Sequence, residues 1–230
     1  MAITTDPGNH FDPAEFDECI EQHGVPANWR KSRICPCFDP KRGQSSITCP
    51  YCTLIPGRLY DAGTEVTVLA PGRERQDKYT DVGSWEQGFV NITFPTLDDA
   101  VSVTPGHFDI VELLSGEIVV NNEFLKRGEL TPGGASRERL RLNPLRVEFI
   151  EAIVASVLVQ YAFFTDYTFD AAGVITWING PPSGTQYSIR YVARPTFIVW
   201  APMSRDEAAT KMPYRVHAQR LDFFERRAVE

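Results

Sequence analysis

The chain has 230 residues, 43% hydrophobic and 23% charged, values typical of a globular protein and unlike those of disordered or fibrous chains. Its 23 basic and 30 acidic residues give a net charge of −7 with no basic block, which argues against duplex DNA binding as the main task. No apolar run approaches the roughly 20 residues that span a bilayer, and the polar N-terminus lacks a signal-peptide core. We therefore expect a soluble chain made in a cytoplasm, with no membrane partner.

The N-terminal part of the sequence predicts a frayed segment over residues 1–10 and then a short helix. Asp12 is a suitable N-cap, Pro13 suits the first turn, and Gly24 is a residue that commonly ends a helix. Residues 25–60 follow as a basic segment rich in turn-forming residues, in which we expect a metal module.

Four of the five cysteines lie within 18 residues as two short pairs. Cys35 and Cys37 form the first pair and, after eleven intervening residues, Cys49 and Cys52 form the second. Each pair spans a tight turn and the intervening loop brings the pairs together, so the pattern predicts four thiolates around one metal ion. Zinc is favoured because it accepts four thiolates without redox chemistry. Four protein ligands leave no position for a catalytic water, which makes the expected zinc structural.

The metal module is also rich in cations, which would offset the negative charge of four thiolates. The basic residues closest in sequence to the cysteines are Arg30, Lys31, Arg33, Lys41 and Arg42.

Three other interpretations of the cysteines stay open. Cys49-Pro-Tyr-Cys52 is also the glutaredoxin active-site pattern and would indicate a dithiol oxidoreductase, but that chemistry needs a helix that Pro56-Gly57 would interrupt. Two disulfides are a second possibility, although a ring between Cys35 and Cys37 would be strained. An iron–sulfur cluster is the third. If one cysteine does not bind the metal, His23 is the best substitute ligand.

Beyond residue 60 the hydrophobic pattern has a period of two and is interrupted by turns, which predicts antiparallel strands. The expected strands are 64–69, 88–94, 109–114, 117–120, 145–153, 156–164, 167–170, 174–177, 185–192 and 195–200. The fold class is therefore mainly β: an antiparallel β-sandwich or small barrel that follows a short helix and a four-cysteine zinc module.

The connections between these strands divide the chain further. Ser115-Gly116 and Asn121-Asn122 are candidate hairpin turns, and residues 127–144 form a polar loop that we expect to be exposed. The pattern over 213–224 fits either a final strand or an arm that docks on a neighbouring subunit.

We expect three parts in all. They are an N-terminal helix with a zinc module (1–60), an antiparallel β-domain (61–205) and a C-terminal arm (206–230).

The sequence contains no recognisable catalytic motif. A nucleotide-binding loop, a nucleophile elbow and a metalloprotease motif are all absent, and the four histidines (His10, His23, His107 and His217) are scattered. We therefore expect no enzyme, no catalytic residues and no organic cofactor.

Two blocks of the sequence resemble virion proteins of tailed bacteriophages. Residues 166–177 and 184–191 follow the patterns Y-T-x-D-x-x-G-x-I-x-W and G-T-x-Y-x-I-x-Y, which recur in β-domains of such proteins. The block from Trp29 to Cys52 is similar to small virion proteins of contractile-tailed phages that are thought to sit in the neck.

The resemblance implies a structural neck or head–tail connector protein that assembles as a ring between portal and tail. Its partners would be other copies of itself and neighbouring neck, portal or tail proteins, in a virion assembled in the bacterial host cytoplasm. A tail terminator or baseplate protein is the alternative within the same class. A zinc-knuckle adaptor is the alternative from another class, and the net charge of −7 argues against nucleic acid as its partner.

Overall fold

The computed structural model describes residues 13–45, 49, 51–52, 54–70, 88–96, 104–129, 138–171, 173–203, 206–207, 210–211 and 213–224. The fold is mainly β, as predicted, with one short N-terminal helix, α1 (Pro13–His23), that ends at Gly24. The expected frayed segment 1–10 lies outside the described residues. In the described part of the chain, no helix combines the length and the apolar character needed to cross a membrane.

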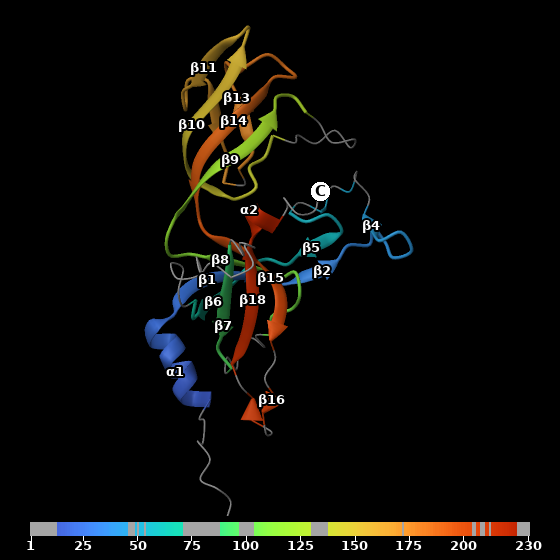
Figure 1. The fold of residues 1–230 in the computed structure, drawn as a ribbon, viewed down its shortest axis with the longest axis vertical. Helices are drawn as coiled ribbons and strands as arrows, with labels where there is room; N and C mark the ends of the chain where they lie inside the picture. Colours follow the sequence, from blue (N-terminus) through green and yellow to red (C-terminus); the bar gives the residue numbers. More distant parts are fainter. Residues whose placement is uncertain are drawn as a thin grey trace, which may run out of the picture.

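Six of the described strands form a closed antiparallel barrel, in the lower half of Figure 1. In order around the barrel they are β6 (Thr64–Val68), β1 (Val25–Arg30), β8 (Ile110–Leu113), β15 (Thr196–Met203), β18 (Tyr214–Arg220) and β7 (Phe89–Phe94). Leu69, directly after β6, and Thr93 of β7 exchange two backbone hydrogen bonds of 2.9 and 2.8 Å, which join the two outer strands. Of the two architectures that the sequence predicted, this part of the chain adopts the small barrel.

The barrel interior is filled by every second residue of its strands, because successive side chains of a strand point to opposite faces. In β1, Ala27 and Trp29 are buried while the residues between and beside them are partly exposed. The Trp29 ring packs against Phe94 of β7, with 5.8 Å between the ring centroids. The period-two pattern that predicted strands is therefore also the pattern that fills the barrel.

A second sheet of four described strands is inserted between the neighbouring barrel strands β8 and β15, and it lies above the barrel in Figure 1. Its order is β11 (Val157–Tyr161), β10 (Pro144–Val154), β14 (Gln186–Ala193) and β9 (Ile118–Lys126), with all pairs antiparallel. A small hairpin of β12 (Tyr167–Phe169) and β13 (Ile175–Trp177) contributes to the same core. Each sheet thus has its own buried apolar side chains.

Two buried carboxylates attach the segment after residue 137 to the inserted sheet. Glu138 accepts hydrogen bonds from Tyr187 Oη at 3.0 Å and Trp177 Nε1 at 2.8 Å. Glu123 accepts hydrogen bonds from Arg141 N–H at 3.0 Å and from Tyr191 Oη at 2.7 Å. Burial, together with the nearby carboxylates, raises the pKa of both tyrosines far above the usual value, so they remain protonated donors.

The metal module projects to one side of the barrel, on the right in Figure 1. It consists of two antiparallel pairs: β2 (Ser32–Ile34) with β5 (Arg58–Tyr60), and β3 (Phe38–Asp39) with β4 (Gln44–Ser45). Two further short strands, β16 (Asp206–Glu207) and β17 (Thr210–Lys211), form a ribbon, and α2 (Leu221–Phe224) directly follows β18.

The structure differs from the sequence predictions at four places. Residues 138–142 of the loop expected to be exposed carry three buried side chains, because Glu138, Leu140 and Leu142 pack against the inserted sheet. Asn121-Asn122 is not a turn, because both residues lie inside the long strand β9. Ser115-Gly116 does not close a hairpin but leads the chain out of the barrel into the inserted sheet. Residues 25–30, expected within the turn-rich metal module, form barrel strand β1 between β6 and β8.

The sequence left open whether residues 213–224 form a final strand or an arm, and the structure shows a strand. Tyr214–Arg220 is strand β18 and pairs with β15 on one side and β7 on the other. This part of the expected 206–230 arm is therefore an internal strand of the barrel.

Candidate metal centre

The structure brings the four predicted cysteines together at one point. Their four Sγ atoms all lie within 4.8 Å of one another, with 3.7 Å between Cys35 and Cys49 and 3.4 Å between Cys37 and Cys52. A tetrahedral zinc ion with Zn–S bonds of about 2.3 Å holds its sulfurs about 3.8 Å apart. The donor set and its spacing therefore fit a metal ion bound by four thiolates.

Two turns position these thiols, and each is built by backbone hydrogen bonds. After the first pair, Phe38 N–H donates to Cys35 C=O at 2.9 Å and closes the turn around Cys37. In the second pair, Tyr51 N–H donates to Cys49 Sγ. An amide N–H that donates to the sulfur stabilises the thiolate form, because a hydrogen bond to a charged acceptor is stronger than one to a neutral acceptor.

Gly57 is the residue that connects the two halves of the site. Its C=O accepts a hydrogen bond from Cys35 N–H at 2.9 Å, and its N–H donates to Cys52 Sγ. Its φ of +77° is in the left-handed region, and a Cβ there would lie 3.1 Å from the Phe38 ring. Gly57 lies five residues after Cys52, and it supplies a turn whose backbone conformation a residue with a Cβ would adopt only with strain.

The thiols have different acidities. The N–H of Tyr51, helped by the neighbouring thiols, lowers the pKa of Cys49 to about 7. Burial and the neighbouring thiol groups raise the pKa of Cys52 to about 12. In the metal-free site Cys49 therefore loses its proton more readily than Cys52, and a divalent cation would displace thiol protons when it binds.

Asp109 joins the metal module to the barrel. This buried carboxylate, 3% exposed, accepts hydrogen bonds from Trp29 Nε1 (2.9 Å), Ser32 N–H (2.7 Å) and Gly106 N–H (2.8 Å). Ser32 begins β2, the strand that leads to Cys35. Since nothing in its local sequence marks Asp109 as such an anchor, sequence analysis missed it.

Apolar contacts hold the other side of the module. Ile55 is buried in the core that also contains residues of the inserted sheet, with Leu54 and Tyr60 packed against it. The Arg58 guanidinium lies over the Phe108 ring, 4.2 Å from its centroid. The metal module is therefore packed into the junction between barrel and sheet.

Three of the five cations near the cysteines in sequence pair with carboxylates. Arg30 pairs with Glu112 at 3.5 Å, Arg33 with Asp61 at 2.5 Å, and the exposed Arg42 with Asp39 at 3.7 Å. The expectation that they would offset the charge of the thiolates stays a prediction.

The described histidines lie apart from the cysteine cluster, which among the described residues contains cysteines only. His23 is exposed at the end of α1. His217 Nδ1 is 3.1 Å from Asn91 Oδ1 and its ring stacks on Phe89. Burial lowers the pKa of His107, which packs on Phe108 and Trp200. His10 lies outside the described residues.

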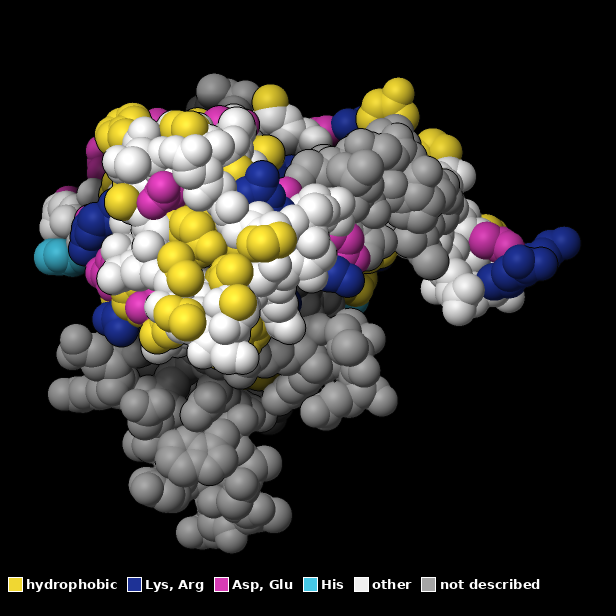
Figure 2. Space-filling view, turned by 90° about the horizontal axis from the view of Figure 1, so that it is seen from above, with side chains coloured by type: hydrophobic (Ala, Val, Ile, Leu, Met, Phe, Trp, Pro, Cys, Tyr) yellow, Lys and Arg dark blue, Asp and Glu magenta, His cyan; other side chains and the backbone are white. Residues whose placement is uncertain are grey.

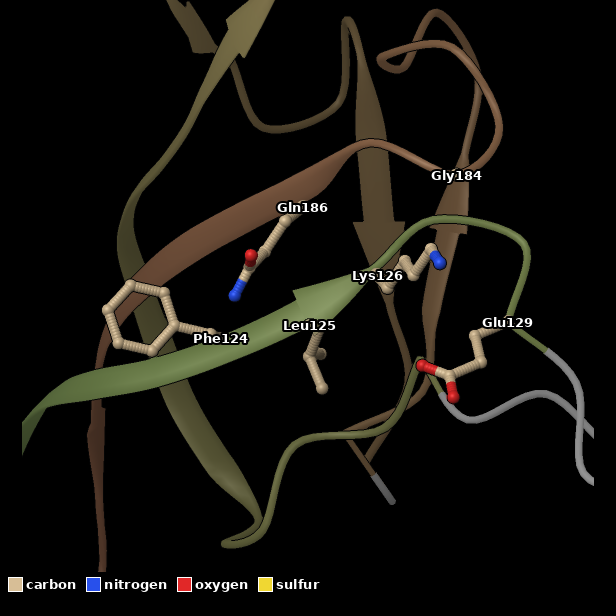
Figure 3. Close-up of a pocket in the computed structure, with 6 residues that line it drawn as sticks. All are labelled: Phe124, Leu125, Lys126, Glu129, Gly184 and Gln186. Carbon is tan, nitrogen blue, oxygen red and sulfur yellow. The ribbon is translucent and has the colours of Figure 1, made fainter.

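A hollow of about 550 Å³ on the inserted sheet is a second candidate for a functional site. Figure 3 shows the Lys126 and Glu129 side chains at one end and the Phe124 ring at the other. Leu125, Gly184 and Gln186 complete the lining. The lining offers neither a thiol nor an imidazole, and the cysteine cluster remains the better candidate site.

No protein-family model matches the chain, and no curated protein matches it either. The expected relation to neck proteins stays a prediction from the two sequence blocks.

Proposed function

We propose that the chain is a non-catalytic assembly protein in which Cys35, Cys37, Cys49 and Cys52 hold a structural zinc ion. The observation that carries this proposal is the grouping of four thiol sulfurs at the spacing of a tetrahedral thiolate site. Four cysteine ligands saturate zinc, so the ion would stabilise the fold and would not activate water. The module is small and has few buried side chains of its own, which is where a bound metal adds most to stability.

The assembly would be a ring of identical copies in the neck of a tailed bacteriophage, between portal and tail. Sequence resemblance supports this assignment, and the surface of the inserted sheet is compatible with it. Phe124, Ile153 and Leu158 lie along one hollow on its outer face, each more than 60% exposed. Figure 2 shows apolar side chains gathered on this upper face. Exposed apolar patches of this kind are typical of contact surfaces between proteins.

A dithiol oxidoreductase is the second candidate, and one observation favours it. A pKa of about 7 makes Cys49 more reactive near neutral pH than an ordinary cysteine thiol. The helix that such enzymes place after the first cysteine is missing here, since residues 54–57 form bends and turns that lead into β5. The two functions make opposite predictions about which cysteines matter.

The test is elemental analysis of the purified full-length protein combined with native mass spectrometry. We expect one zinc ion per chain and a ring-sized oligomer. Cys35→Ser should lose the zinc and unfold at a lower temperature than the wild type. Cys19→Ser, which changes an exposed cysteine on α1, should keep the zinc and the wild-type unfolding temperature. Labelling of this protein in virions should then place it at the neck; labelling at the tail end or baseplate would support the alternative within the class.

The enzyme candidate has its own readout. Absence of zinc, with dithiol reductase activity lost in Cys49→Ser and kept in Cys35→Ser, would refute the structural proposal and establish the oxidoreductase.

A further inference from the structure

The charge of this protein is distributed unevenly along the chain. Residues 31–60, which contain the metal module, carry five basic residues and one acidic residue, a net charge of +4. The rest of the chain therefore carries −11 within the total of −7. Zinc with four thiolates contributes −2, which leaves the module at about +2. A basic module on an acidic protein is a natural contact for another copy of that protein.

The exposed end of the module is the β3–β4 hairpin, whose turn carries Lys41 and Arg42. The backbone N–H of Lys41 donates to the Asp39 carboxylate at 2.9 Å, and the N–H of Gly43 donates to Asp39 C=O at 2.9 Å, so the turn is well defined. The Arg42 side chain is 81% exposed, and its Nε lies 3.7 Å from the Asp39 carboxylate of the same hairpin. Seen from above, basic side chains stand at the far right of the molecule, the side on which Figure 1 places this hairpin.

The acidic counterpart is helix α1. It contains no lysine or arginine and has four acidic residues: Glu15, Asp17, Glu18 and Glu21. A hollow of about 440 Å³ lies beside the helix. Its lining combines three of these acids with small and apolar side chains: Ala14, Asp17, Glu18, Ile20, Glu21, Thr67 and Pro95. The hollow is thus an acidic depression on the barrel surface.

The two features lie on opposite sides of the barrel, α1 at the left and the hairpin at the right in Figure 1. Two different, complementary surfaces on opposite sides of a molecule give a head-to-tail contact. When such a contact repeats, it produces a closed ring or a filament and not a two-fold dimer.

We propose that the β3–β4 hairpin of one copy docks into the acidic hollow beside α1 of the next copy. Lys41 and Arg42 meet Glu18 and Glu21 across the contact, and electrostatic complementarity fixes its orientation. The inference deepens the proposed function and rests on it, because it names the contact through which copies would join.

The contact also gives the metal site a role in assembly. Cys35 and Cys37 immediately precede β3, so a metal ion bound there fixes the base of the hairpin. A hairpin held in one orientation loses little conformational entropy when it docks, which strengthens binding. Metal removal should therefore weaken assembly as well as fold stability.

The test uses charge reversal on each surface and then on both. The hairpin variant is Lys41→Glu with Arg42→Glu, and the helix variant is Glu18→Lys with Glu21→Lys. Asp17 is left unchanged because it binds Thr96 N–H at 2.8 Å and so attaches α1 to the barrel. The control reverses two exposed basic residues of the inserted sheet, Lys126→Glu with Arg146→Glu, and changes the net charge by the same amount as the hairpin variant.

Assembly is measured by sedimentation velocity and native mass spectrometry at low and high salt, with zinc content as the check of folding. Each single-surface variant should raise the dissociation constant at least about tenfold, since like charges then face each other. The variant with both surfaces reversed should assemble again, and the control should assemble like the wild type. Wild-type assembly should weaken as salt rises.

Three results would overturn the inference. If the wild type assembles and both reversed variants assemble equally well, this interface is wrong and the ring forms through another surface. If the wild type stays monomeric at every concentration, the ring itself is refuted. If the hairpin variant keeps its assembly and loses binding to duplex DNA, the hairpin belongs to a nucleic-acid interface instead.

Discussion

Substitution of Asp109 is the sharpest test of how the metal module is attached to the barrel. One carboxylate oxygen accepts Ser32 N–H, and the other accepts both Trp29 Nε1–H and Gly106 N–H, at distances of 2.7 to 2.9 Å. Asp109→Asn keeps the side-chain volume but has a single acceptor oxygen. One donor then faces an NH₂ group, and the remaining hydrogen bonds lose their charged acceptor. At about 1.5–3 kcal/mol for a hydrogen bond to a charged group, the loss should be about 2–4 kcal/mol.

Urea denaturation of the zinc-loaded protein measures this loss. The matched control is Glu117→Gln, which removes an exposed carboxylate paired with Arg146 at 2.8 Å and should cost less than about 0.5 kcal/mol. A loss below about 1 kcal/mol for Asp109→Asn would show that water replaces the missing acceptor, and that Asp109 does not anchor the module.

Three further substitutions test other parts of the fold. Burial and the carboxylate of Glu138 raise the pKa of Tyr187 above its unfolded value of about 10. The Tyr187 hydroxyl therefore stabilises the folded protein below pH 10, and this stabilisation is lost as the pH rises above 10 towards the folded-state pKa. Tyr187→Phe should therefore be about 1–2 kcal/mol less stable than wild type at neutral pH, and this gap should narrow in urea titrations above pH 10. The turn between β10 and β11 holds Ala155 and Ser156 at φ of 50° and 67°, a conformation that Asn-Gly adopts readily. Ala155→Asn with Ser156→Gly should stabilise the protein by about 1–2 kcal/mol, and a lower melting temperature would contradict the turn geometry. Gly57→Ala should weaken zinc retention against a chelator, because its φ of +77° and the adjacent phenyl ring both oppose a Cβ; unchanged zinc retention would mean that the turn relaxes freely.

The sequence was most informative where structure is local. Cys35 and Cys52 are separated by only 16 residues, so two turns bring all four thiols together whatever the rest of the chain does. Helix α1 was likewise predictable, because Pro13 and Gly24 mark its two ends within the same short segment. The period-two pattern located nearly every long strand, since alternation of buried and exposed residues is a property of a single strand.

Only the tertiary structure decided how those strands pair. Both β8 and β9 are recognisable as strands in the sequence, yet one belongs to the barrel and the other to the inserted sheet. Barrel closure depends on Leu69 and Thr93, and nothing in their local sequence distinguishes them from other strand residues. The anchoring role of Asp109 is of the same kind, because its donors Trp29 and Ser32 lie 80 and 77 residues away. Contacts this distant in sequence form only when the whole chain packs, which is why local patterns predicted the elements and the cysteine cluster but not how the strands are arranged.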